Sequence, residues 1–245
     1  MQADLNVYHF IFLPVLGLFV GAAGTLVGIG GGFILVPVLI LLFPDAPTET
    51  VTSISLAVVF LNATSGSIGY LREGRVDIRS GILFAIAAVP AAIIGAIATA
   101  KVGRVTFDAV FGLTMIAGAA YLLWRSRIIK LKRVRNDWPS TNRVLLDKTD
   151  CIYRYNVNEP LDMGVSVVAG GASSFLGIGG GIIHMPAMVA LMKIPPPIAA
   201  GTSHFVLVFA ALTGVLVLSV GVWLSALRSE YCSPGGLILA CWLRF

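Results

Sequence analysis

A five-residue run, Gly-Ile-Gly-Gly-Gly, occurs twice in this chain, each time inside an apolar stretch and each time followed by a proline. The first copy occupies 28–32 and the second 177–181, and seven of the ten positions from 28 to 37 are identical to those from 177 to 186. A Thr-Ser pair follows each copy at nearly the same spacing: Thr52-Ser53 and Thr202-Ser203. Two matches in the same order at nearly one offset indicate an internal duplication.

The composition places this duplication in a membrane protein. The chain is 57% hydrophobic and 12% charged, with a mean hydropathy of +0.92, whereas soluble domains carry about 25% charged residues. A net charge of +5 would suggest nucleic acid for a soluble protein, but the cations here lie between apolar stretches, so we expect no nucleic-acid partner. The three cysteines have no metal-ligand spacing, and neither a metal site nor a cofactor is expected.

The glycine runs lie in apolar stretches that are too long for one plain span. Residues 10–43 carry no charge over 34 residues, which is about 51 Å of helix against roughly 30 Å of hydrocarbon. Two crossings would need about 40 residues, and glycines disfavour an unbroken helix. The pattern predicts a broken or re-entrant helix whose turn lies at membrane depth and faces protein or a watery cavity.

We therefore predict an all-α polytopic membrane protein with about six apolar spans in two repeats, four in the first and two in the second. The expected spans are 10–43, 51–71, 81–100, 105–124, 161–192 and 198–227. Residues 1–124 form the first repeat, 125–160 a basic loop and 161–245 a shortened second repeat. If each broken run is one crossing, four crossings separate the two runs, which favours parallel repeats; an odd number would give inverted ones.

Lysine and arginine predict the orientation. On this count 13 of them lie on the side of the basic loop and 3 on the other, so the loop should be cytoplasmic.

The glycines are the main candidates for a substrate site. A helix that restarts at Phe33 or Ile182 exposes free backbone N–H groups with partial positive charge, which suit an anion. Close helix packing by small residues is the alternative explanation. The candidate positions are Gly28, Gly30, Gly31, Gly32, Gly177, Gly179, Gly180 and Gly181.

Four hydroxyl residues and two histidines complete the candidate site. Thr52, Ser53, Thr202 and Ser203 can donate hydrogen bonds to an oxyanion, or they can cap the helices that they begin. His184 and His204 lie well inside apolar stretches, and their counterparts in the first half are not histidines. They are candidates for a proton site, with a histidine bonded to a neighbouring helix as the alternative.

Enzymatic readings fit the sequence poorly. The glycine runs lack the Gly-Lys-Ser/Thr ending of a phosphate-binding loop, and no strand precedes them. Ser203 and His204 are neighbours on a helix and so cannot face one another as nucleophile and base. No catalytic residue is assigned, and we do not expect an enzyme.

The paired runs, each followed by a Thr-Ser pair, resemble the TauE/SafE family of sulfite exporters. The segment Gly66-x2-Gly69-Tyr70-x3-Gly74-x-Val76-Asp77 is similar to that family's pattern as well. The resemblance implies a multi-pass permease of the bacterial inner membrane. Its partners would be the lipid bilayer and a small anion, often one that contains sulfur, such as sulfite, thiosulfate or a sulfonate.

The carboxyl end departs from this pattern. The second half supplies two spans where the first supplies four, and 235–243 is too short an apolar stretch to cross. The alternative is therefore a truncated or degenerate membrane protein without transport activity of its own. A half that pairs with another copy, as a homo-oligomer, is the other way to complete the second repeat.

Overall fold

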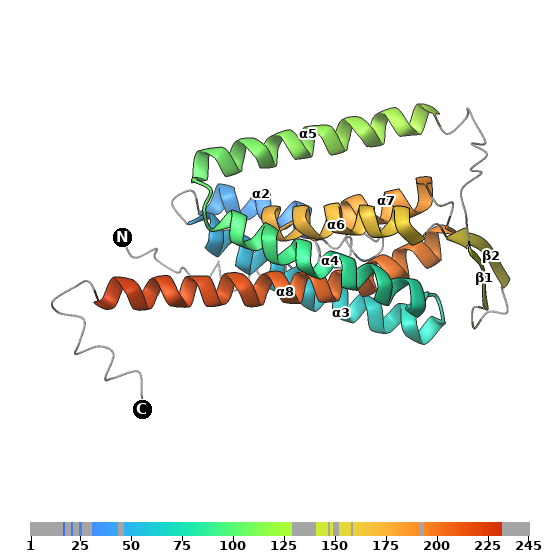
Figure 1. Ribbon diagram of the computed structural model, residues 1–245. Coiled ribbons are helices and arrows are strands. Elements are labelled where there is room, and N and C mark those ends of the chain that lie inside the picture. The colour runs from blue at the N-terminus through green and yellow to red at the C-terminus, as the bar shows by residue number, and fades with distance from the viewer. Residues whose placement is uncertain are drawn as a thin grey trace.

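The computed structural model describes residues 17, 21, 25, 31–43, 47–128, 141–146, 148, 152–157, 159–191 and 194–231. These residues form seven helices and one antiparallel two-stranded hairpin (Figure 1). The elements are α2 (Gly32–Leu42), α3 (Thr48–Glu73), α4 (Ile78–Thr99), α5 (Arg104–Ile128), β1 (Thr141–Leu146), β2 (Ile152–Val157), α6 (Glu159–Leu176), α7 (Gly181–Leu191) and α8 (Pro196–Tyr231).

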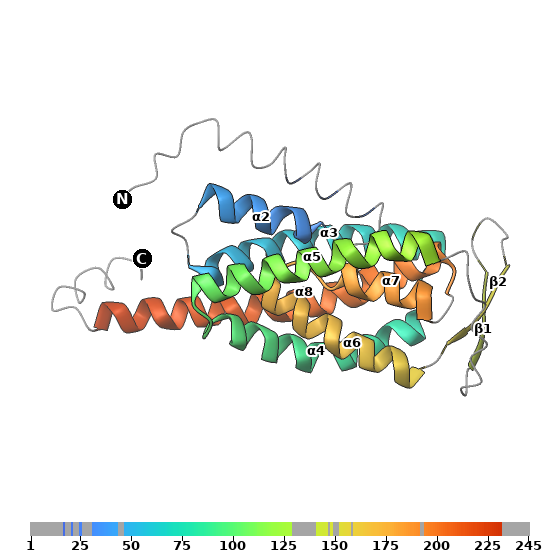
Figure 2. The same ribbon diagram turned by 90° about the horizontal axis from the view of Figure 1, so that it is seen from above.

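The long helices lie side by side, and the molecule has two distinct ends (Figures 1 and 2). At one end, which we call the hairpin end, α3 stops, α4, α6 and α8 begin, and the two strands project from the bundle. The amide of Lys148, between the strands, donates to the carbonyl of Glu73 at the last turn of α3 (3.2 Å). At the opposite end α2 is followed by α3, and α4 is followed by α5.

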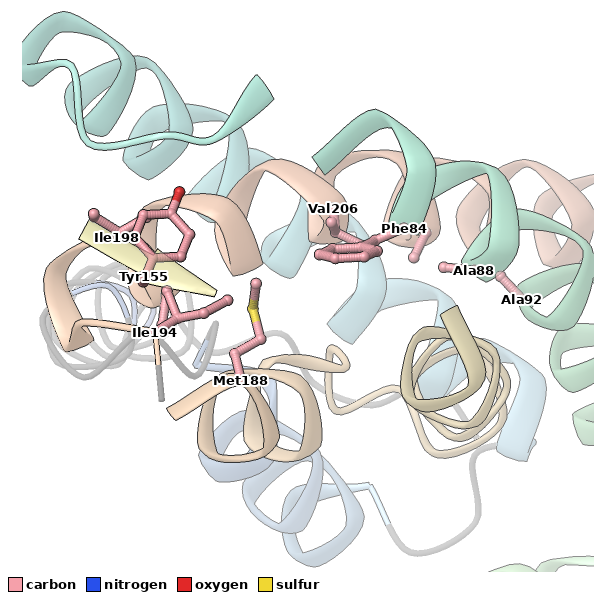
Figure 3. Packing of buried hydrophobic residues seen from close by; sticks show 10 residues of the cluster. Phe84, Ala88, Ala92, Tyr155, Met188, Ile194, Ile198 and Val206 are labelled. Carbon is pink, nitrogen blue, oxygen red and sulfur yellow. The ribbon is translucent and has the colours of Figure 1, made fainter. Parts of the chain in front are cut away.

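The two helices that follow the glycine runs point in opposite directions. From Gly32, α2 runs to the opposite end, where Leu39 packs with Val51 and Phe107. From Gly181, α7 runs to the hairpin end, where Met188 packs with Tyr155, Ile194 and Ile198 (Figure 3).

The prediction of parallel repeats was therefore wrong. It counted each glycine run as one crossing, but α6 enters from the hairpin end and α7 returns to it. Three full passes, α3, α4 and α5, separate the two runs, and an odd number gives opposite orientations.

Small residues bring α4 and α6 into close contact. A side chain at Gly95 would collide with the carbonyl oxygen of Gly171, and one at Gly170 would lie 2.5 Å from the carbonyl oxygen of Ala88. In lipid, where apolar surface gains little from leaving its surroundings, close backbone packing of this kind holds helices together. Helices α4 and α6 are therefore closely packed against one another.

The corner between α3 and α4 is fixed by Asp77. Its carboxylate caps α4 by accepting from the amide of Ser80 (3.2 Å), and it also accepts from the Ser80 hydroxyl (2.7 Å) and the Tyr155 hydroxyl (3.0 Å). Its own amide donates to Oγ1 of Thr202 on α8 (3.1 Å). This corner thus ties α4, α8 and the hairpin together at one end of the bundle.

Most helices agree with the expected spans to within a few residues. By length and composition α3, α4 and Pro196–Gly221 of α8 can each cross a membrane, among the residues that the structure describes. Large apolar side chains on the outer surface, such as Ile94 and Leu113, are suited to contact with lipid. The fold is helical, but the strands within 125–160 and the extension of α5 to Ile128 were not expected.

Some predicted features lie outside the described residues. They include Gly28, Gly30, the cluster of cations within 129–140 and the tail 232–245. The arrangement of six spans in two repeats stays a prediction.

Candidate functional site

The second glycine run forms a turn inside the bundle. The chain leaves α6 after Leu176 and begins α7 at Gly181, and between them Gly177 (φ 70°) and Gly179 (φ 79°) adopt left-handed backbone conformations. Side chains are disfavoured there, so glycine is what allows the chain to reverse so tightly. The break that the sequence predicted in this span is confirmed, and α7 begins one residue earlier than expected.

Helix α3, from the first half, holds this turn in place. The Ser55 hydroxyl donates to the carbonyl oxygen of Gly177 (2.6 Å), and that bond is buried. The backbone of Thr52 lies against Gly177, and a side chain at Gly179 would collide with Val59. The turn of the second repeat is therefore built on the helix that carries the Thr-Ser pair of the first.

The first glycine run meets the second directly. Gly31 (φ 77°) precedes α2, and its carbonyl oxygen accepts the amides of Ile34 and Leu35. A side chain at Gly32 would collide with the carbonyl oxygen of Ile178 and with Val59. Runs 149 residues apart in the sequence thus lie in contact, with Val59 beside both.

The amino ends of two half-length helices therefore converge inside the bundle, as the directions of α2 and α7 require. Each amino end carries N–H groups without helical partners and about half a unit of positive charge. Two such ends together form a positive site without a charged side chain. This is the feature of the structure that best suits an anion.

A cavity of about 10 Å³ touches the amino end of α7. Its polar lining comes from Gly180 and from the side chains of Ser166, His184 and Ser203, while alanine, valine and leucine form the rest. The volume corresponds to about one water molecule. In this state of the protein the site is too small for an oxyanion.

The four predicted hydroxyls occupy different environments. Thr52 and Ser203 are fully buried, and neither hydroxyl has a hydrogen-bond partner among the described residues; the same holds for the partly exposed Ser53. The Thr202 hydroxyl instead accepts the amide of Asp77. Ser203 lines the cavity, and Thr52 lies on the turn.

The two histidines have no partner in common. Nε2 of His184 lies 2.9 Å from the Ser166 hydroxyl, and its ring meets Phe84 edge-on. His204 is bonded through Nδ1 to the carbonyl oxygen of Ala200 (3.0 Å), and its ring lies over Tyr70 of α3. Only His184 lines the cavity.

Sequence reasoning missed Ser55 and Ser166. Both serines are buried. Ser55 lies on α3, which carries Thr52 and Ser53, and Ser166 lies on α6, one turn after Asp162. A search for polar residues four positions from an acidic one would have found Ser166. Ser55 offers no such signal, because its partner is a backbone carbonyl 122 residues away.

Comparison with known proteins identifies the family of this chain. The family model for the sulfite exporter TauE/SafE matches residues 13–242, which includes most of the tail that the sequence had set apart. The chain is 31% identical over 211 residues to the probable membrane transporter protein YunE of Bacillus subtilis, covering 84% of this chain and 76% of that protein.

More distant organisms carry relatives as well. The probable membrane transporter protein MJ0441 of Methanocaldococcus jannaschii is 27% identical over 225 residues, covering 88% of this chain and 76% of that protein. The sulfite exporter TauE/SafE family protein 1 of Arabidopsis thaliana is 35% identical over 92 residues, which is 38% of this chain and 20% of that protein. No solved structure matches. The chain is a multi-pass membrane transporter and belongs to the TauE/SafE family.

Proposed function

We propose that this protein is a permease for small oxyanions, which binds its substrate where the amino ends of α2 and α7 converge. The observation that carries the proposal is the contact between the two glycine runs, Gly32 against Ile178, at the start of two oppositely directed half-length helices. Sulfur-containing anions such as sulfite, thiosulfate and sulfonates are the favoured substrates, and the bacterial inner membrane is the favoured location.

The donors at this place suit an oxyanion. Two helix amino ends offer about one unit of positive charge in total, and their amides point toward the ligand. Thr52 and Ser203 add buried hydroxyls with no partner among the described residues. The described residues that line the cavity include no lysine or arginine, so its positive character comes from the helix amino ends.

Transport requires this site to open. Because Gly32 touches Ile178 and the cavity is only about 10 Å³, the two turns must separate before an anion fits between them. Movement of the two oppositely directed half-length helices against one another around this shared site would alternate its access between the two sides. The second turn, which α3 holds through the bond from Ser55 to Gly177, would stay with α3 while α2 moves.

Sulfite is the first anion to test, because the relative from Arabidopsis thaliana is named a sulfite exporter family protein. The purified chain would be reconstituted in lipid vesicles, and entry of radiolabelled sulfite and thiosulfate would be measured. Unlabelled sulfate and chloride would serve as competitors. Uptake that is saturable and absent from empty vesicles supports the proposal.

Two glycine variants make the test specific. Gly180→Leu places a bulky side chain beside the amino end of α7, where Cβ alone would lie 2.8 Å from the carbonyl oxygen of Ala169. Because that side chain would keep the anion away from about one backbone amide, we expect flux to fall about tenfold or more. Gly164→Leu is the matched control, since nothing lies within 4 Å of a side chain at that position of α6. No flux of either anion by well-folded wild-type protein would contradict the proposal and favour a degenerate transporter.

A further inference from the structure

Asp162, in the first turn of α6, is an unusual residue for its surroundings. Its side chain is fully buried, and neither carboxylate oxygen has a hydrogen-bond partner among the described residues. The ion pairs within the described ranges join Arg75 to Glu73 and Arg104 to Asp108, and neither involves Asp162. Since an isolated buried carboxylate is costly, a group of this kind usually binds something.

Among the described residues, no cation on the elements packed around α6 pairs with Asp162. Asp77 on α4 is occupied by Ser80 and Tyr155, and His204 on α8 is turned toward Tyr70 of α3. At the hairpin end, the titratable and charged residues on α6 and on the described elements beside it are Glu159 on α6, Asp77 just before α4, Arg79 on α4, Arg143 on β1, Tyr153, Arg154 and Tyr155 on β2, His184 on α7, His204 on α8, and Tyr70, Arg72 and Glu73 on α3.

Ser166 connects Asp162 to His184. Its hydroxyl donates to the backbone carbonyl of Asp162 (2.7 Å) and lies 2.9 Å from Nε2 of His184. A hydroxyl has one hydrogen, so Nε2 of His184 must be the donor in the second bond. That assigns the hydrogen of the neutral ring to Nε2, and it leaves Nδ1, which has no described partner, free to accept a proton.

Among the described residues that line the cavity, His184 alone can become a cation. A monovalent anion at the amino end of α7 adds one negative charge inside the membrane, which is expensive unless it is balanced. A proton on Nδ1 of His184 would balance it at the site itself. Asp162, nearer the hairpin end on the same helix pair, is placed to pass a proton from water to that nitrogen.

We propose that Asp162 and His184, positioned by Ser166, form a proton-binding site that is loaded when an anion occupies the second glycine turn. The coupled ligand is a proton. The neutral carboxyl of Asp162 passes a proton to Nδ1 of His184, which becomes an imidazolium, and Asp162 takes a replacement proton from water at the hairpin end. The site thus gains one proton with each anion, and release of the anion returns one proton to water. This inference rests on the proposed function for its coupling, although the proton site itself does not require transport.

The first experiment needs no transport. Infrared difference spectra of the reconstituted protein would be recorded while the pH is varied. We expect the carbonyl band of a protonated carboxylic acid that is lost in Asp162→Asn and retained in Asp108→Asn, a control whose carboxylate is paired with Arg104. Asp162→Glu should shift the band rather than remove it. Identical spectra of wild type and Asp162→Asn would overturn the proposal.

The second experiment tests coupling. Vesicles containing a pH-sensitive dye would report proton movement while labelled sulfite enters. We expect protons to move with sulfite in wild type, and His184→Gln to abolish sulfite-driven proton movement. Ser166→Ala should displace the pH profile of uptake, and Ser166→Thr should restore it, as expected of a positioning residue.

The outcomes separate the two proposals. Sulfite flux that does not depend on the pH gradient, or that depends on a sodium gradient instead, overturns the proposed proton coupling. The proposal that the protein is a permease would stand. A carboxylic acid band that depends on Asp162, found without sulfite flux, supports the proton site and contradicts sulfite as the substrate.

Discussion

The two glycine turns are copies by sequence, but their surroundings differ. At the second turn His184, Ser203 and Ser166 surround a small cavity. At the first, the place of His184 is taken by Leu35, which is buried in an apolar cluster with Val36 and Leu39. Both halves thus keep glycine immediately before a half-length helix, at Gly31 before α2 and Gly180 before α7, whereas polar side chains gather only at the second among the described residues.

The Thr-Ser pairs show the same divergence. The Thr202 hydroxyl accepts a hydrogen bond from the amide of Asp77, whereas the Thr52 hydroxyl has no partner among the described residues. One copy therefore supports the fold, and the other remains available to a ligand. A repeat can keep its residues and still change what they do.

The largest expected effect concerns the direction of the two half-length helices. With Cys151, Cys232 and Cys241 replaced by serine, a cysteine would be introduced at an exposed proline before α3 (Pro47→Cys) or at the start of α8 (Pro196→Cys). We expect a membrane-impermeant reagent to label the Pro196 variant only from the cytoplasmic side, with the basic loop, and the Pro47 variant only from outside. Labelling of both variants from the same side would show that α2 and α7 point in the same direction, as parallel repeats require.

The contact between Gly32 and Ile178 should leave no room for an added methyl group. Gly32→Ala would drive Cβ into the carbonyl of Ile178, and we expect a loss of about 1–3 kcal/mol in the free energy of unfolding, as for an overpacked core. Gly164→Ala has open space and should change little. Thermal unfolding in mild detergent measures both, and equal midpoints would show that the turns do not touch.

The two threonines should respond oppositely to loss of the hydroxyl. Thr202→Val leaves the buried amide of Asp77 without its acceptor, at a cost of about 1–3 kcal/mol of stability. Thr52→Val removes a buried hydroxyl without a described partner, so stability should stay the same or rise while anion uptake falls. If Thr52→Val alone destabilises the protein, the roles assigned to the two pairs are reversed.

The smallest expected effect is at the hairpin. Tyr155→Phe removes one of three donors to the Asp77 carboxylate, and the two bonds from Ser80 remain. We expect a loss of about 1 kcal/mol, measured by the same unfolding experiment. A much larger change would mean that the strands hold the α4 corner more firmly than the helices do.

The sequence predicted the break at 177–181 and the long helices because both follow from local chemistry. Glycines at 177 and 179 allow left-handed backbone, and uncharged stretches of 20 or so residues form spans wherever they occur. The direction of α7 could not be predicted, because a turn that continues the chain and one that reverses it use the same glycines. That choice decided the relative orientation of the halves.

The site was predictable in its backbone and less so in its side chains. Gly31, Gly180 and Ser203 are found at the turns or the cavity as their motifs suggested. Ser55 and Tyr155 depend on partners more than 70 residues away, so no spacing in the sequence reveals them. Long-range bonds of this kind appear only once the helices are packed.

Half-length helices also determine how this protein would respond to voltage. Each of α2 and α7 has 11 residues, about 16 Å, so together they match the roughly 30 Å of hydrocarbon. Their meeting point then lies near the electrical midpoint of the membrane. An unaccompanied monovalent anion reaching it from either side would cross about half the potential, or about 1.1 kcal/mol per 100 mV, whereas one that arrives with a proton would cross none.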